Sequence, residues 1–185
     1  MNLDLQIKDN FLPNDLFQKL AVYSATLEYS GTSLAYKSKT KDNHVWLSNH
    51  IQEDDELLKE IEKYIIKHFG VKIKNLHLAA FTCVNSKKAQ PHKDEEVFPN
   101  EKHLIIYLNG DPKLNAGTGF YNVLGDDTLT YDLNTAVGCF PNRAVIFNAF
   151  DNVHSPLLYN SEDSKPRFSI IIWFEPEYQL PQNNK

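Results

Sequence analysis

The chain has 185 residues, 42% of them hydrophobic, which is the size of one ordinary domain with a single core. Its 24 Asp and Glu outnumber its 19 Lys and Arg and give a net charge of -5, which argues against nonspecific binding to nucleic acids or anionic lipids. The longest apolar run, residues 170–174, is far shorter than the roughly 20 residues of a membrane-spanning helix. We expect one domain over residues 1–185, with no nucleic-acid partner and no membrane segment.

Helical periodicity is confined to the first 70 residues. Pro13 favours the first turn of one helix, whose apolar positions recur at Leu16, Phe17, Leu20 and Tyr23. A second helix begins after a capping Asp54 or Asp55 and ends at Gly70. Its apolar stripe consists of Leu57, Leu58, Ile61, Ile65 and Phe69.

After Gly70 the period changes to that of strands. Short segments rich in β-branched and aromatic residues alternate with Asn, Asp, Gly and Pro. They span residues 71–74, 76–84, 103–108, 118–123, 128–132, 136–140, 143–148 and 167–174. Because no helical segment separates them, the pattern predicts a mainly β (α+β) chain, an antiparallel sandwich or jelly roll with the two N-terminal helices packed outside.

The two cysteines, Cys83 and Cys139, lie in apolar, strand-like segments without a nearby Cys or His at metal-ligand spacing. We expect two buried free thiols, which fits a reducing compartment. Residues 1–10 alternate polar and apolar and lack the core of a signal peptide. A cytoplasmic location is therefore expected; the sequence does not predict an oligomeric state.

Three side chains form the strongest candidate site: His92, Asp94 and His154. In an extended segment residues i and i+2 point to the same side, so His92 and Asp94 present two ligands from one edge. A distant strand can bring His154 to the same point. Non-haem Fe(II) oxygenases use two histidines and one carboxylate because this set leaves positions open for substrate and oxygen. The H-x-D triplet alone is a weak signal, since it also occurs in surface turns.

A buried cation would complement this site. Arg167 lies thirteen residues after His154, beside the most apolar predicted strand, where an unpaired charge is costly to bury. Fe(II), the Asp94 carboxylate and a dianionic 2-oxo acid together leave one negative charge, which one guanidinium cancels. The guanidinium also matches a carboxylate in a two-pronged hydrogen bond. We interpret Arg167 as a clamp for a 2-oxo acid; an exposed surface arginine is the alternative.

These motifs together resemble the Fe(II)- and 2-oxoglutarate-dependent oxygenases, and within them the compact prolyl 4-hydroxylase-like branch. The resemblance covers about residues 11–174 and rests on six features: the H-x-D motif of residues 91–94, the strand 103–109, the glycine-rich turn 116–120, the strand 141–147, His154 as distal ligand and the final strand 167–173. It implies a double-stranded β-helix. The glycine-rich turn departs from the family pattern at Ala116.

The resemblance also implies the chemistry. His92, Asp94 and His154 would bind Fe(II), and Arg167 would grip the far carboxylate of 2-oxoglutarate. Tyr107 would add its hydroxyl to the same carboxylate, although a core tyrosine is the alternative, and Ser169 shares a face with Arg167 and could assist. The expected activity is hydroxylation of a C–H bond with O2, releasing succinate and CO2. A peptidyl proline is the best single substrate, ahead of small molecules.

Other features have a structural explanation. The lysines of residues 36–41 are expected to protect an edge strand, and contact with an anionic substrate is the alternative. Trp173 stands six residues after Arg167, where the nucleic-acid demethylase branch of the family has a second arginine. This difference argues against a role in base repair. The remaining histidines are expected to be surface or structural residues: His44, His50, His68, His77 and His103. The alternative function is a non-catalytic, cupin-like binding module, which would not need Arg167 and Tyr107 to face a metal.

Overall fold

The computed structural model describes residues 4–31, 46–84, 91–94, 100–110, 112–124, 130–157 and 167–178. The two helices in this part of the chain are α1 (Asn14–Thr26) and α2 (Glu56–Phe69), and a short 3-10 turn spans Leu114–Ala116. The strands there are β1 (Leu5–Lys8), β2 (Ser30–Gly31), β3 (Trp46–His50), β4 (Val71–Val84), β5 (Lys102–Asn109), β6 (Thr118–Leu124), β7 (Thr130–Val137), β8 (Arg143–Asn148), β9 (Val153–Pro156) and β10 (Arg167–Tyr178). The prediction of a mainly β chain with two N-terminal helices is confirmed.

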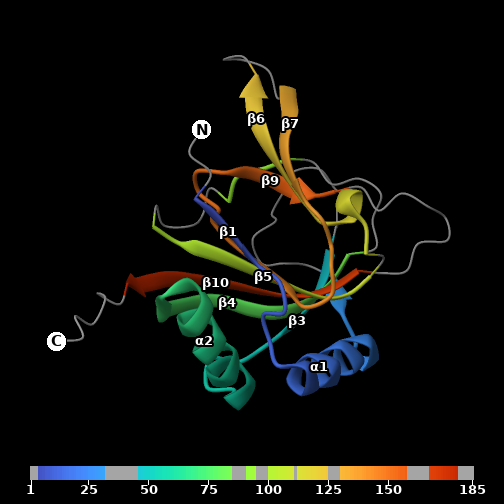
Figure 1. Ribbon diagram of the computed structural model, residues 1–185, viewed down its shortest axis with the longest axis vertical. Coiled ribbons are helices and arrows are strands. Elements are labelled where there is room, and N and C mark those ends of the chain that lie inside the picture. Colours follow the sequence, from blue (N-terminus) through green and yellow to red (C-terminus); the bar gives the residue numbers. More distant parts are fainter. Residues whose placement is uncertain are drawn as a thin grey trace.

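The strands form two antiparallel sheets. The large sheet has the order β1-β8-β5-β10-β4-β3-β2, and the small sheet has the order β7-β6-β9. In Figure 1 both helices lie below the large sheet, the small sheet lies above it, and the β6–β7 hairpin projects away from the body of the molecule. Two layers of side-chain packing result, one on each face of the large sheet.

The second helix follows its sequence signals closely. The Asp55 carboxylate accepts a hydrogen bond of 2.8 Å from the Leu57 backbone N–H, which caps the first turn. Gly70 ends the helix with φ of 69°, a left-handed conformation that glycine adopts without steric cost. The apolar stripe then packs on β4 through Leu58, Ile61 and Ile65, all of which are buried.

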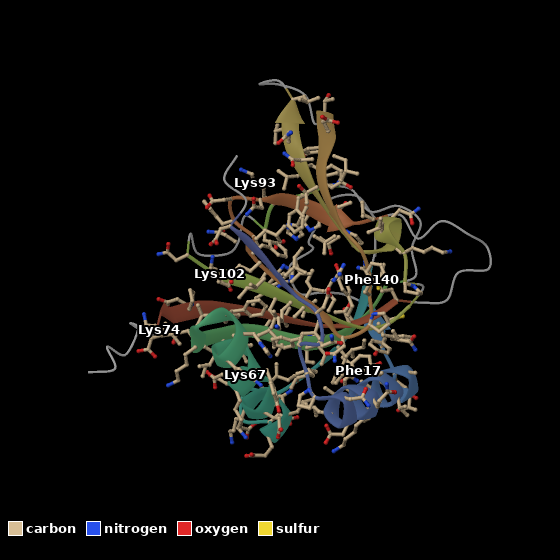
Figure 2. The ribbon with its side chains drawn as sticks, viewed as in Figure 1. Phe17, Lys67, Lys74, Lys93, Lys102 and Phe140 are labelled. Atoms are coloured by element: carbon tan, nitrogen blue, oxygen red, sulfur yellow. The ribbon has the colours of Figure 1, made fainter. Side chains whose placement is uncertain are left out.

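The two faces of the large sheet have different cores. The core on the helix side contains alternate residues of β5 and β10 with α1 and α2, and includes Phe17, Leu104 and Ile170. The core on the other side lies between the two sheets and includes Phe120 and Phe147. Figure 2 labels Phe17 and Lys67 in the helix layer, and Lys93 on the opposite side of the large sheet, near β9.

Several predicted strand boundaries are wrong. Residues 71–74 and 76–84 form one strand, β4, because irregularities in its pairing with β10 absorb the break in period at Asn75. In the described part of the chain, one strand, β7, covers residues 130–137, and residues 138–140 are not in a strand; residues 128–129 lie outside the described residues. Four strands were not predicted, namely β1, β2, β3 and β9.

Some expectations concern composition rather than topology. Cys83 and Cys139 are both buried and neither forms a disulfide, as predicted. Neither helix in the described ranges combines the length and the apolar character needed to cross a membrane. The lysine-rich segment 36–41 and His44 lie outside the described residues.

Candidate metal centre

Two of the predicted ligands are held together by backbone pairing. His92 lies in the segment 91–94 and His154 lies in β9, and the two form an isolated antiparallel bridge. The His92 N–H donates to the His154 carbonyl at 3.0 Å, and the His154 N–H donates to the His92 carbonyl at 2.9 Å. The imidazole rings therefore lie beside each other, with centroids 4.8 Å apart.

Asp94 completes the group. Its Oδ1 lies 3.7 Å from His92 Nε2, and its Oδ2 lies 3.6 Å from His154 Nε2. One ligand atom from each residue lies within 4.8 Å of the other two. The structure thus brings the three predicted side chains to one point, in a set of two nitrogens and one carboxylate that suits Fe(II) and similar divalent metals.

The protonation states also suit a metal. Burial lowers the pKa of His154 to about 3, so its imidazole is neutral near pH 7. Burial alone would raise the pKa of Asp94, but His154, His103 and His92 outweigh it and lower that pKa to about 2. Ionised Asp94 and neutral His154 are the forms that bind a metal, so neither needs to lose a proton first.

A carbonyl group fixes the tautomer of His154. Its Nδ1 lies 3.1 Å from the Asn152 backbone carbonyl oxygen, so this nitrogen carries the proton and donates it. The Nε2 atom is then left with a lone pair directed toward Asp94. The ring packs against Phe147 at 4.9 Å and Phe120 at 6.5 Å between centroids, which holds its orientation.

His103 is a residue of this site that the sequence reasoning assigned to a surface or structural role. It is 6% exposed, and its Nδ1 lies 3.7 Å from Asp94 Oδ2. Burial lowers its pKa, so the ring is neutral near pH 7. The strand period contained the signal, because His103 and Tyr107 share one face of β5. The missing information was that this face also meets Asp94.

Arg167 is buried at the other end of the same core. Its Nη1 donates to the Ala116 carbonyl at 2.9 Å and also to the Gly117 carbonyl. Its Nε is buried without a hydrogen-bond partner. A guanidinium held by two carbonyls and left with an unused donor is the arrangement expected of a carboxylate-binding group.

The turn beside Arg167 requires glycine. A Cβ atom on Gly117 would lie 1.8 Å from the Val137 carbonyl oxygen and 2.7 Å from the Cys139 nitrogen. Only a residue without a side chain lets this turn lie so close to the end of β7. The close approach places the Ala116 and Gly117 carbonyls on Arg167, so the departure at Ala116 leaves the arginine contact in place.

Two hydroxyl pairs lie near the arginine. The Tyr107 hydroxyl lies 2.7 Å from Thr118 Oγ1, and the Arg167 guanidinium carbon is 5.5 Å from the Tyr107 ring centroid. Burial raises the pKa of Tyr107 to about 12, so the hydroxyl stays protonated. Ser169 is buried opposite Tyr107, and Thr82 Oγ1 lies 3.3 Å from its Oγ. Thr82 and Thr118 were not singled out by the sequence.

Two residues of β5 mark the ends of the site, His103 beside Asp94 and Tyr107 beside Arg167. His103 and Tyr107 lie on the same face of one strand, four residues apart, which corresponds to about 13 Å. A five-carbon diacid, together with the reach of an arginine and of a metal–oxygen bond, spans such a length. At the metal end, Asp94 Oδ2 is buried without a hydrogen-bond partner. The residues present therefore fit both a divalent metal and 2-oxoglutarate.

No model of a protein family matches this chain, and no curated protein matches its sequence. Solved structures do match its fold. A Pseudomonas putida prolyl-4-hydroxylase aligns at a TM-score of 0.58 with 16% identity, covering 94% of this chain and 93% of that chain. A prolyl hydroxylase in complex with a hypoxia inducible factor peptide fragment, from Trichoplax adhaerens, aligns at 0.57 with 15% identity, covering 92% and 83%.

A third match has a different described activity. The epimerase SnoN, in complex with Fe3+, alpha ketoglutarate and nogalamycin RO, aligns at a TM-score of 0.61 with 11% identity, covering 98% of this chain and 87% of that chain. At these identities the likeness concerns the fold. The chain therefore shares its fold with prolyl hydroxylases and with an epimerase that binds iron and alpha ketoglutarate.

Proposed function

We propose that this protein is an Fe(II)- and 2-oxoglutarate-dependent dioxygenase. One observation carries the proposal: a cation site and a buried guanidinium lie at two ends of one core, each with an unused polar atom. Asp94 Oδ2 and Arg167 Nε are both buried without a hydrogen-bond partner. Buried polar groups are normally satisfied, so each atom indicates a missing ligand of opposite charge. A dianion that chelates a metal with one end and meets an arginine with the other satisfies both.

The chain's own residues have three tasks in this reaction. His92, Asp94 and His154 hold the metal, and Arg167 binds the far carboxylate of 2-oxoglutarate, with Tyr107 and Ser169 assigned as further contacts. Bound iron and 2-oxoglutarate supply the oxidising chemistry, in which O2 is consumed and succinate and CO2 are released. The aromatic core around Phe147 excludes water, so that the reaction is directed to the substrate.

The proposed reaction is hydroxylation of a C–H bond. A peptidyl proline is the substrate that the sequence resemblance favours, and two proteins of the same fold are named as prolyl hydroxylases. The fold alone also accommodates a small molecule, as the SnoN complex illustrates. Incubating candidate peptides and small molecules with the iron-loaded protein and 2-oxoglutarate should give a product heavier by one oxygen, detected by mass spectrometry.

A spectroscopic experiment separates this function from a non-catalytic, cupin-like binding module. Under anaerobic conditions, Fe(II) followed by 2-oxoglutarate should give a visible charge-transfer band, because a chelated 2-oxo acid absorbs there. Asp94→Ala should remove the band, and Arg167→Gln should require far more 2-oxoglutarate to produce it. A wild-type protein that binds Fe(II) but gives no band would support the binding module. Lys74→Gln, on the exposed surface, is the matched control.

We also propose a single domain over the whole chain and a cytoplasmic location. Two buried cysteines that form no disulfide support a reducing compartment. The proposed partner is the substrate, a peptide or a small molecule, and the net charge of -5 disfavours nucleic acid and anionic membrane surfaces.

A further inference from the structure

A fourth histidine faces the metal ligands from the large sheet. His103 is the second residue of β5 and is buried. Its Nδ1 lies 3.7 Å from Asp94 Oδ2, and its ring centroid lies 5.6 Å from that of His154. No role in metal binding follows directly, because the three-residue ligand group of His92, Asp94 and His154 does not include it.

The facing atoms of His103 and Asp94 are complementary and unused. His103 Nδ1 and Asp94 Oδ2 are both buried without a hydrogen-bond partner. Their separation of 3.7 Å exceeds that of a hydrogen bond, and a shift of about 1 Å closes it. A buried acceptor and a buried donor that face each other gain more from pairing than either gains from remaining alone.

The imidazole is the fixed partner of the two. In the large sheet, His103 pairs with Phe147 of β8 on one side of β5 and with Trp173 of β10 on the other side. The ring packs against both of these side chains, with centroids 5.0 Å and 5.1 Å away. Two neighbouring strands therefore hold the ring in place, whereas Asp94 lies in a short segment outside the two sheets. The Asp94 carboxylate is therefore the group that moves to close the gap.

We propose that His103 is a positioning residue for Asp94: its Nδ1–H donates to one lone pair of Oδ2 and so directs the remaining lone pairs of the carboxylate toward the metal. The inference rests on the proposed metal site and deepens it. Hydrogen bonds from outside the ligand set orient ligating carboxylates, and removing such a bond typically lowers metal affinity 10- to 100-fold. His103 thus determines how tightly the site binds its metal rather than touching the metal itself.

Two substitutions separate positioning from packing. His103→Phe keeps an aromatic ring against Phe147 and Trp173 but removes the donor. His103→Asn loses ring packing but places an amide N–H near the position of Nδ1. Positioning predicts that the Phe variant loses metal affinity and the Asn variant retains most of it. A purely structural role predicts the reverse order. Ile105→Val, on the same face of β5, is the control for lost packing alone.

Co(II) is a suitable probe, since its visible d–d bands report both occupancy and coordination geometry. We expect His103→Phe to weaken Co(II) binding roughly 10- to 100-fold and to change the band shape. His103→Asn and Ile105→Val should stay within about threefold of the wild type, below the range expected for a lost orienting bond. Circular dichroism and urea unfolding confirm that each variant is folded.

The outcomes for the inference and for the proposed function are distinct. If the wild type binds Co(II) and Asp94→Ala does not, the metal site stands. Equal affinity of His103→Phe and wild type would then overturn the role of His103 alone, as would a His103→Asn variant weaker than His103→Phe. Equal Co(II) binding by wild type and Asp94→Ala, or none by either, would overturn the metal site and the inference together.

Discussion

Arg167 is the residue whose surroundings indicate an anionic ligand most directly. It is 4% exposed, and a cation in such a position needs compensation that two carbonyls supply only in part. Neither its hydrogen bonds to Ala116 and Gly117 nor the Tyr107 ring beside it carries a full negative charge. The proposed carboxylate ligand would complete the compensation. The affinity for 2-oxoglutarate should therefore depend strongly on this one side chain.

Replacing Arg167 by Gln should weaken 2-oxoglutarate binding to the metal-loaded protein roughly 30- to 3,000-fold, because breaking a buried charge pair costs about 2–5 kcal/mol. Isothermal titration calorimetry measures the affinity directly. Arg143→Gln is the matched control, since Arg143 pairs with Asp9 near the surface. A loss of threefold or less in Arg167→Gln would contradict the assigned role.

Gly117 offers a second test at the scale of one residue. Adding a methyl group there forces the turn away from Val137 and displaces the carbonyls that hold Arg167. We expect Gly117→Ala to lower the free energy of unfolding by about 1–3 kcal/mol and to weaken 2-oxoglutarate binding. Gly70→Ala should lower the free energy of unfolding by about 1 kcal/mol, because the φ of this residue is positive, and should leave 2-oxoglutarate binding unchanged. Equal 2-oxoglutarate affinity in both variants would contradict the argument.

At the scale of elements, Asn142 joins the N-terminal segment to the large sheet. Its side-chain amide donates to the Leu12 carbonyl at 2.8 Å and accepts from the Leu12 N–H at 2.8 Å. Its own backbone N–H donates to the Tyr107 carbonyl at 2.9 Å. The start of α1 is thus fixed to the end of β5 that carries Tyr107. Asn142 has φ of 61°, a conformation that asparagine tolerates better than most residues.

Asn142→Ala should lower the free energy of unfolding by about 3–6 kcal/mol, because it leaves two buried backbone groups of Leu12 unsatisfied and strains φ. Asn142→Gly loses the same hydrogen bonds without the strain, so it should be more stable than the Ala variant by about 1 kcal/mol. Urea unfolding gives both values. An Ala variant as stable as wild type would show that solvent replaces the two hydrogen bonds from Asn142 to Leu12.

The site elements differ in how well the sequence predicted them. The strand carrying Arg167 is long, apolar and β-branched, so its period identified it. The strand carrying His154 has four residues, including Ser155 and Pro156, and such a segment has no strand signal of its own. It forms because β6 pairs with one edge and His92 with the other. Pairing partners distant in sequence decide such elements, and a local pattern does not contain them.

The same reasoning explains why the sequence did not place His103 in the site. Its place on the inner face of β5 follows from the two-residue period, but its nearness to Asp94 depends on how the segment 91–94 lies over the sheet. The bridge between His92 and His154 sets that position. The H-x-D spacing therefore pointed to the candidate ligands, whereas His103, which faces them through a tertiary contact, was assigned a surface or structural role.

At the scale of the whole molecule, the proposed metal ligands lie where the small sheet meets the large one. β9 supplies His154, and β5 supplies His103 opposite it. Each ring is buried among aromatic side chains, which keeps it neutral. Burying two imidazoles and one ionised carboxylate without a metal makes the stability of the whole fold depend on pH.

The sign of this dependence follows from the lowered pKa values. His154 has a pKa of about 3 in the folded chain, against an ordinary value of 6.5. Between these values the unfolded chain binds a proton that the folded chain does not, so stability falls as the pH is lowered through this window. Burial lowers the pKa of His103 in the same direction. Asp94, with a pKa of about 2 instead of 3.8, adds to the loss only below pH 3.8.

The metal-free protein should therefore lose up to about 1.4 kcal/mol of stability per pH unit for each buried histidine below its ordinary pKa. Urea unfolding at pH 7.5, 6 and 5 measures the slope, and His154→Gln should reduce it by about one proton per chain. His50→Gln, at an exposed position, should leave it unchanged. Because a bound metal competes with these protons, the metal-loaded protein should be more stable than the metal-free protein at pH 7.5, and this advantage should shrink on acidification. Stability that is flat between pH 7.5 and 5 would mean that the imidazoles take up protons inside the folded chain.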